Sequence, residues 1–490
     1  MLKQIFSDNV TLTWTIFGID WTIRLLLGTR IIMRRSPTGF TLAWLSVVLV
    51  LPILGAVIYL LLGERRLGTR RARRVAELRK PYRAWLDKLA EDFGAESLQV
   101  SGPGEMIRRQ ARGTIGVPVL PGNSLDLISD AASFFEALVA DIDASLSSVH
   151  LEFYIWMPGG RADDVSNALI RAAGRGVKCR VLVDDVGGSE LIGSQPHADM
   201  VRAGVRVVAM LEVGVLRAAF ARVDIRNHRK IAVIDGVIGY VGSQNIVDPT
   251  MVKEQAGIGE WIDAMVRITG PAVEALQVTL LADWEFETFE GIEKQAADLD
   301  IIRGTATGES MVQVVPSGPG LSQLAIQELI LTAMYAATNE LVLTTPYFIP
   351  DEAMIKALLS AAARGVDVQL MLPRYPDSRI VKWAGESYFE ELLEGGVKIC
   401  RYEGGMLHTK AIVIDGQTAM FGSVNLDMRS FYLNFEISIV VYNGAFAQKV
   451  RELQAHYLQS SQKLDLQRWR ARPVALRFIQ QTAQLLSPLL

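Results

Sequence analysis

Two stretches of the chain repeat one arrangement of residues that can do chemistry on an anionic group. NHRKIAVIDGVIGYVGSQN begins at Asn227, and LHTKAIVIDGQTAMFGSVN begins at Leu407. Each contains His-x-Lys, an Asp five residues after the Lys, and then Gly-Ser-x-Asn. Because the chain has only five histidines, the use of two of them in one repeated pattern indicates a shared task.

Strand periodicity predicts which side chains of each pattern meet. His228 and Lys230 are two residues apart, so on a strand they share a face. Ser243 and Asn245 share a face in the same way on a returning strand. Asp235 has the opposite parity and precedes a glycine, which favours a structural role in a turn. The equivalent residues of the second copy are His408, Lys410, Asp415, Ser423 and Asn425.

The His, Lys and Asp residues of both copies form the candidate catalytic set, and the Ser and Asn residues are candidate phosphate-binding groups. Two such clusters around one cavity suit a phosphodiester, because lysine and asparagine bind its non-bridging oxygens. One neutral histidine attacks phosphorus, and the other, protonated, donates to the leaving alkoxide. The patterns contain too few carboxylates and cysteines for a metal site, so we expect neither metal nor cofactor. A buried core histidine beside a lysine explains one copy, but explains two copies poorly.

The two patterns lie in two similar halves. In the first half, SSVHLEFYIWMPGG and CRVLVDD are strand-like and flank the helical stretch DDVSNALIRAAGRGVK. In the second half, NELVLTTPYFIP, DEAMIKALLSAAARGVD and VQLMLPR repeat this order, and AGVRVV and GGVKIC add a strand to each half. This order predicts an α/β sandwich with a mostly parallel or mixed sheet in each half, the halves packing face to face around one site.

The N-terminal region is expected to be a membrane anchor. Thr41–Gly63 has 23 residues without a charge, which as a helix would span about 34 Å, enough to cross a bilayer core. Val10–Leu27 is apolar but carries Asp20 and Arg24, which share a helix face and can neutralise each other. This earlier segment either spans the membrane or lies in its interface. The expected organisation is an anchor over 1–66 with segments at about 10–29 and 41–63, a basic linker over 67–109, a first half over 110–300, and a second half with a C-terminal helix over 301–490.

Charge and composition indicate on which side of the membrane the globular part lies and which classes of molecule it binds. Half of the residues are hydrophobic, and the net charge of −3 gives no overall basic field for nucleic acid. Two cysteines are too few for a disulfide framework. Eight basic residues follow the second apolar segment and three precede it, which predicts a cytoplasmic globular part and a basic run able to hold anionic lipids. The eight are Arg65, Arg66, Arg70, Arg71, Arg73, Arg74, Arg79 and Lys80, and the three are Arg30, Arg34 and Arg35.

With H-x-K-x-x-x-x-D and G-S-x-N each present twice, the chain resembles the phospholipase D superfamily. The apolar N-terminal segments, the basic linker, VVPSGPG at 314–320 and TTPYFIP at 344–350 are similar specifically to bacterial cardiolipin synthases. The resemblance implies a multi-pass enzyme of the bacterial cytoplasmic membrane. It also implies transfer of a phosphatidyl group from phosphatidylglycerol to His228 with release of glycerol, and then attack by a second phosphatidylglycerol to give cardiolipin. His408 would serve as acid and then base, and Asp263 and Glu436 are the positional candidates for carboxylates that orient the two histidines.

Several alternatives remain open at the level of sequence. A hydrolase that releases phosphatidic acid and a phosphatidylserine synthase would share the same motifs, because pocket shape decides the acceptor. A noncatalytic membrane scaffold would be expected to carry degenerate motifs, whereas both copies are intact. The sequence leaves undetermined whether phosphatidylethanolamine is also a donor, which acyl chains are preferred, and whether the chain forms a homo-oligomer.

Overall fold

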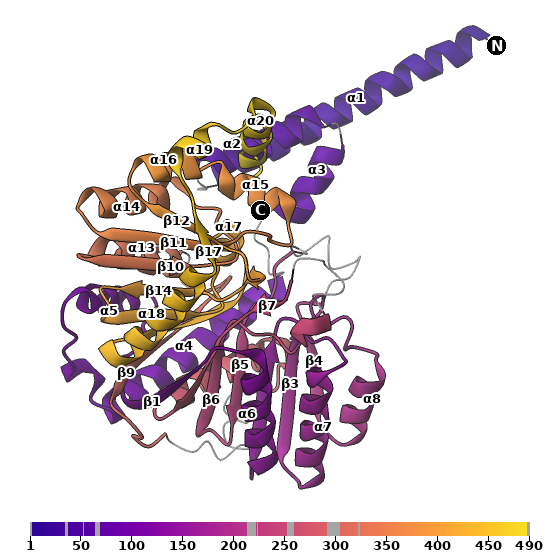
Figure 1. Cartoon of the computed structure of the whole chain (residues 1–490). Coiled ribbons are helices and arrows are strands. Elements are labelled where there is room, and N and C mark those ends of the chain that lie inside the picture. The colour runs from indigo at the N-terminus through magenta and orange to yellow at the C-terminus, as the bar shows by residue number, and fades with distance from the viewer. Residues whose placement is uncertain are drawn as a thin grey trace. The chain divides into compact units, whose positions relative to one another are not determined.

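The computed structural model describes residues 2–34, 38–51, 53–63, 69–212, 222, 224–251, 259–291, 304–321 and 324–487. The chain divides into two compact units. The N-terminal unit comprises residues 1–70 and 213–225, and the larger unit comprises 71–212 and 226–490. Both His-Lys patterns belong to the larger unit (Figure 1).

The N-terminal unit is helical, and its apolar run is interrupted. It contains α1 (Leu2–Met33), α2 (Thr38–Val50), α3 (Leu54–Ile58) and a π-helical turn, η1 (Tyr59–Gly63). The segment expected over 41–63 is divided among α2, α3 and η1 in the described residues, and α2 ends at Val50, two positions before a proline in the sequence. Among the described residues, no helix combines the length and the apolar character needed to cross a membrane.

The paired charges of the N-terminal unit meet as the sequence predicted. Arg24 Nε lies 2.7 Å from a carboxylate oxygen of Asp20. The other Asp20 oxygen accepts a hydrogen bond of 3.0 Å from the backbone N–H of Ile53, the residue that follows the break. Ile53 has a φ of 54°, in the left-handed region that a β-branched residue rarely adopts. Asp20 therefore contacts both the Arg24 side chain and the backbone N–H of Ile53.

A mixed sheet forms the centre of the larger unit (Figure 1). In the first half, β2 (Ser148–Phe153), β3 (Lys178–Asp184) and β4 (Arg206–Met210) are parallel, and β5 (Lys230–Ile234), β6 (Ile238–Gly242), β8 (Met265–Thr269) and β1 (Leu120–Ile128) continue the sheet antiparallel. In the second half, β10 (Glu340–Thr344), β11 (Asp367–Pro373) and β12 (Lys398–Tyr402) are parallel, and β14 (Ala411–Ile414), β15 (Thr418–Gly422), β16 (Glu436–Val441) and β9 (Ser310–Ser317) repeat the antiparallel part. A short strand, β17 (Ser461–Lys463), pairs with β12.

The α/β class and the duplication are confirmed, and the join between the halves was not foreseen. β1 and β9, the first strands of the two halves, pair antiparallel, so one sheet runs through both halves. Buried runs such as VLVD in β3 and LMLP in β11 carry few polar side chains because helices cover the sheet. These helices recur in both halves as α6 (Ala131–Ala144) and α13 (Ala325–Ala336), α7 (Arg161–Gly174) and α14 (Glu352–Ala363), and α11 (Ala272–Thr288) and α18 (Gly444–Gln459).

Helices before and after the repeats also pack onto the larger unit. Much of the stretch expected to be a linker forms α4 (Thr69–Asp92), which contributes Leu86 and Leu89 to the core. Next comes α5 (Pro103–Thr114), which packs against α13. At the other end of the chain, α20 (Val474–Gln484) packs against α15 (Arg379–Glu386), where Gln480 Nε2 donates a hydrogen bond of 2.8 Å to Glu386.

Candidate active site

Each histidine is held by the backbone of the opposite half. His228 precedes β5, and its N–H donates a 2.8 Å hydrogen bond to the Phe435 carbonyl, one residue before β16 begins. In the other direction, β13 (Met406–Leu407) pairs in parallel with β7 (Trp261–Ile262). The His408 N–H then donates a 2.9 Å hydrogen bond to the Ile262 carbonyl. The next residue after each of these carbonyls is an acid, so the backbone contacts set which carboxylate meets which imidazole.

Each histidine pairs with a carboxylate from the other half of the chain. His228 Nδ1 lies 2.9 Å from Oε2 of Glu436, and His408 Nδ1 lies 2.7 Å from Oδ1 of Asp263. An ionised carboxylate accepts hydrogen bonds only, so each Nδ1 carries the proton and each Nε2 presents a lone pair. The two acids proposed from sequence are thus brought to the histidines, each acid coming from the half that does not carry its histidine.

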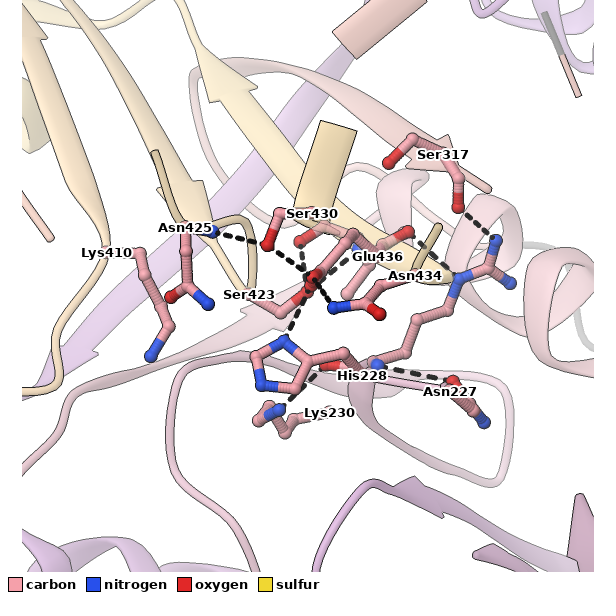
Figure 2. A network of polar contacts seen from close by, with 12 residues as sticks. Asn227, His228, Lys230, Ser317, Lys410, Ser423, Asn425, Ser430, Asn434 and Glu436 are labelled. Carbon is pink, nitrogen blue, oxygen red and sulfur yellow. Dashed lines mark hydrogen bonds and ion pairs between the residues drawn. The ribbon is translucent and has the colours of Figure 1, made fainter. Parts of the chain in front are cut away.

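Glu436 lies at the centre of a polar cluster, as Figure 2 shows. Ser423 Oγ donates to its Oε2 at 2.6 Å, Ser430 Oγ donates to its Oε1 at 2.9 Å, and Asn434 Nδ2 donates to Oε1 at 3.2 Å. Asp263 has fewer partners, because its Oδ2 receives no hydrogen bond from the described residues. The two acids therefore differ: the charge of Glu436 is shared among several donors, whereas that of Asp263 is directed mainly at His408.

The two serines occupy positions behind the histidines. Ser423 Oγ is engaged by Glu436 and also accepts from the Ile437 N–H at 3.0 Å. Ser243 Oγ exchanges hydrogen bonds of 3.2 and 3.1 Å with the Ala264 carbonyl and N–H. Through these contacts the two hydroxyl groups bind the acid-bearing strands, and their predicted role in phosphate binding stays a prediction.

The two asparagines, by contrast, line the same cavity as the histidines. Asn245 Oδ1 accepts a 3.1 Å hydrogen bond from the Ile155 N–H, which leaves its Nδ2 without a partner among the described residues. Asn425 has an amide oxygen without a partner in the same part of the structure. Both side chains are almost fully buried, at 1% and 4% exposure. Buried polar atoms normally have a hydrogen-bond partner, so Asn245 Nδ2 and Asn425 Oδ1 are candidates to bind a polar ligand.

Both lysines are buried beside the histidines whose carbonyls they bind. Lys230 Nζ donates to the His228 carbonyl at 2.7 Å, and Lys410 Nζ donates to the His408 carbonyl at 2.6 Å. Burial lowers the pKa of Lys230 to about 7 and that of Lys410 to about 8, against the opposing attraction of the nearby acids. Each ammonium keeps further N–H groups for an anion, and a bound phosphate would favour its charged form.

Burial also controls the charge of the imidazoles. It lowers the pKa of His228 to about 4, although Glu436 acts in the opposite direction. Burial likewise lowers the pKa of His408, with Asp263 opposing it. Both imidazoles are therefore mainly neutral near pH 7, the state needed for a nucleophile.

The motif aspartates lie at the far end of the strands from the histidines. Asp235 follows β5, and its carboxylate accepts from the N–H groups of residues 146–148 at 2.7–2.9 Å. Asp415 follows β14 and accepts in the same way from residues 338–340. Both have a positive φ, 52° and 51°. They fix the starts of β2 and β10, as the alternation argument favoured.

A cavity of about 450 Å³ contains both histidines. Trp261 lies against His408 with ring centroids 4.7 Å apart, and Tyr154 lies 5.1 Å from His228. The motifs did not predict these rings, although Tyr154 directly follows β2, and ligands of such sheets bind at the carboxyl ends of parallel strands. Further charged or hydroxylated lining residues are Arg226, Tyr347, Asp377, Ser378, Asp427 and Arg429. Within the described residues, no group of three or more His, Cys, Asp or Glu could hold a metal ion.

Comparisons with known proteins agree with this geometry. A family model described as "Cardiolipin synthase, PLD-like domain" matches residues 138–259 and 330–457, and one described as "Phospholipase_D-nuclease N-terminal" matches 24–64. Cardiolipin synthase A of Yersinia pseudotuberculosis serotype O:1b (strain IP 31758) is 40% identical over 483 residues, which cover 98% of this chain and 99% of the relative. Cardiolipin synthase A of Yersinia pestis bv. Antiqua (strain Angola) has the same identity and coverage.

A solved structure supports the fold alone. Phosphatidylserine synthase of Haemophilus influenzae Rd KW20 has a TM-score of 0.60 and 12% identity, covering 79% of this chain and 100% of its own.

Two repeated α/β halves, each with one His-Lys pair and each contributing its histidine to a single cavity, define an enzyme of the phospholipase D superfamily. Within that superfamily, the full-length similarity shows that the chain belongs to the bacterial cardiolipin synthases. It is a phosphatidyltransferase with phospholipid substrates such as phosphatidylglycerol, and the family predicted from sequence is confirmed.

Proposed function

We propose that the enzyme joins two phosphatidylglycerol molecules through a phosphatidyl-histidine intermediate on His228. The observation that carries this proposal is the convergence of both histidines on one cavity, each with Nδ1 tied to a carboxylate of the other half. In the first step His228 Nε2 attacks phosphorus while the bond from phosphorus to the glycerol oxygen breaks. His408 Nε2–H gives its proton to that oxygen, and glycerol leaves.

The second step reverses the proton movement. A hydroxyl of the second phosphatidylglycerol loses its proton to His408 Nε2 and attacks phosphorus. The bond from phosphorus to His228 Nε2 then breaks, which yields cardiolipin and restores both imidazoles. During both steps the buried lysines and the free amide of Asn245 stabilise charge on the non-bridging oxygens.

The difference in hydrogen bonding between Glu436 and Asp263 supports the roles given to the two histidines. The two sequence motifs are alike and do not distinguish these roles. Glu436 divides its charge among Ser423, Ser430, Asn434 and His228, so it stabilises an imidazolium on His228 only weakly. Asp263 directs its charge at His408, which favours His408 as the group that carries a proton. A substrate phosphate next to His408 favours the protonated imidazole further. His228 is then the nucleophile and His408 the acid and base.

Incubation of the purified enzyme with labelled phosphatidylglycerol tests the overall reaction. Mass spectrometry should find cardiolipin and glycerol in equal amounts. Phosphatidic acid as the main product would show a hydrolase instead, and a product formed only when serine is added would show a phosphatidylserine synthase. No turnover under any of these conditions would support the scaffold alternative.

We further propose that the N-terminal unit attaches the enzyme to the bacterial cytoplasmic membrane, with the larger unit in the cytoplasm. Support comes from large apolar side chains of α1 that are well exposed, among them Trp14 at 68% and Leu26 at 67%. The excess of basic residues after residue 63 supports the orientation. Protease added to sealed spheroplasts should leave residues beyond Lys80 intact, and cleavage there without lysis would reverse the topology.

A further inference from the structure

We infer that Asp427 is a specificity-determining residue that binds the headgroup glycerol of the leaving and attacking substrates. This inference rests on the proposed function and names what the same cavity recognises beyond the phosphate. Asp427 is 6% exposed and lines the cavity that contains both histidines. It stands two residues after Asn425, in the loop that leads from β15 to α17 (Met428–Tyr432).

The carboxylate of Asp427 has one oxygen engaged and one available. Oδ1 accepts a 2.7 Å hydrogen bond from the Ser430 N–H and so caps α17. This cap uses Oδ1 and leaves Oδ2 as the second acceptor oxygen of a carboxylate that lines the cavity. The other cavity carboxylate outside the histidine pairs, Asp377, is exposed and already accepts a 2.7 Å bond from the Tyr347 hydroxyl.

An unpaired acceptor lies close to Asp427 in sequence and belongs to a residue that lines the same cavity. The amide oxygen of Asn425 has no partner among the described residues, and the side chain is 4% exposed. The amide oxygen of Asn434, which lines the same cavity, also has no partner among the described residues. A buried acceptor without a donor is costly, so these two amide oxygens indicate a ligand that donates hydrogen bonds. The Asn425 amide can then contact a phosphate oxygen through its NH₂ group and a neighbouring hydroxyl through its oxygen.

The chemistry of the substrate identifies that donor. A phosphatidylglycerol carries a phosphate anion and ester oxygens, which accept hydrogen bonds and repel a carboxylate. Its only donors are the two free hydroxyls of the headgroup glycerol. Because the forward and reverse reactions pass through one geometry, the leaving glycerol and the attacking glycerol use the same subsite. Asp427 therefore binds the hydroxyl next to the reacting oxygen in both steps.

Acceptor competition tests this assignment on the full-length enzyme. A phosphatidyl p-nitrophenol donor loads the enzyme without glycerol, and equal concentrations of glycerol and 1-propanol then compete for the phosphatidyl group. The product ratio is read by mass spectrometry. Asp427→Asn keeps the helix cap, since Asn caps as well as Asp, but turns the free oxygen into an NH₂ donor. We expect its preference for glycerol over 1-propanol to fall by about 10-fold to 100-fold, the value of a hydrogen bond to a charged group.

Asp248 supplies a matched control. It follows Asn245 in the first half, but its oxygens are occupied by Thr250 and the Arg161 N–H, and it does not line the cavity. Asp248→Asn should keep the wild-type ratio.

The inference is overturned if Asp427→Asn retains the nitrophenol burst and the wild-type acceptor ratio, or if it loses the burst as well. A wild-type preference for ethanolamine over glycerol that disappears in Asp427→Asn would overturn it too, because the residue would then bind an ammonium group. Failure of the wild-type enzyme to load at all would instead contradict the phosphatidyl-histidine mechanism.

Discussion

Replacement of the two acids by their amides should have very different effects, although both acids face a histidine. In Glu436→Gln, the new NH₂ group meets a donor at either oxygen position. At the Oε2 position it faces the Nδ1 proton of His228. At the Oε1 position it faces the Ser430 hydroxyl and the NH₂ group of Asn434, whose amide would have to turn to present its unpaired oxygen. The first arrangement forces the proton of His228 onto Nε2, the atom that must attack phosphorus.

Asp263→Asn meets no such conflict. Its NH₂ group can occupy the position of Oδ2, which has no partner among the described residues, and its oxygen can still accept from His408 Nδ1. The tautomer of His408 is kept, and only the charge of its partner is lost. A hydrogen bond to a charged group exceeds a neutral one by roughly 1–1.5 kcal/mol, so we expect a loss of about tenfold.

For Glu436→Gln the expected loss is on the order of 10³–10⁴-fold, as for other enzymes whose histidine is held in the wrong tautomer. Steady-state cardiolipin formation measures both variants, and the nitrophenol burst shows whether the loss lies in the attack. The burst should be nearly absent in Glu436→Gln and present in Asp263→Asn. Equal losses in the two variants, or a Glu436→Gln enzyme within tenfold of wild type, would refute the tautomer argument.

Three further predictions follow from the site. Burial lowers the pKa of His228 to about 4, so the imidazole lone pair is available above that pH. The burst rate should therefore stay level from pH 7 to pH 5 and fall only near pH 4. A decline that begins at pH 6.5 would contradict the burial effect. Turnover in detergent micelles should persist in EDTA, because both Nδ1 atoms are committed to carboxylates and the described residues offer no metal-binding group; loss of turnover that a divalent ion restores would count against the histidine mechanism. Asp235→Ala should lower the free energy of unfolding by about 1–3 kcal/mol, because it leaves N–H groups unpaired. Asp235→Asn should lower it less, because asparagine tolerates the positive φ at this position. Chemical denaturation measures both variants, and equal losses would show that φ is unimportant.

The sequence predicted the repeated elements well because short-range periodicity determines them. Residues two apart on a strand share a face, and this rule placed each His-Lys pair together and turned Asp235 away. For the serines the rule does not foresee a local contact: the Ser243 hydroxyl bonds the backbone of Ala264 and the Ser423 hydroxyl bonds the backbone of Ile437. Hydropathy measures apolar character and does not register that a proline within the segment 41–63 lacks the N–H donor that a continuous helix uses.

The crossing of the carboxylates could not be predicted from either half alone. It depends on which residues of one half pair with which residues of the other, at the β7–β13 pair and at the bridge between Asn227 and Phe435. Those contacts join residues more than 140 positions apart, and no local pattern encodes their register. The motif indicated the histidines and the family resemblance indicated the two acids, whereas the tertiary structure shows which acid meets which histidine.

Trapping the intermediate tests the central claim most directly. With a labelled phosphatidyl p-nitrophenol donor, which needs little protonation of its leaving group, His408→Ala should release nitrophenol in one stoichiometric burst and keep the label on His228. His228→Ala should give neither burst nor label. Label on His408 in the His228→Ala enzyme would reverse the roles of the two histidines, and label on neither residue in any variant would contradict the covalent mechanism itself.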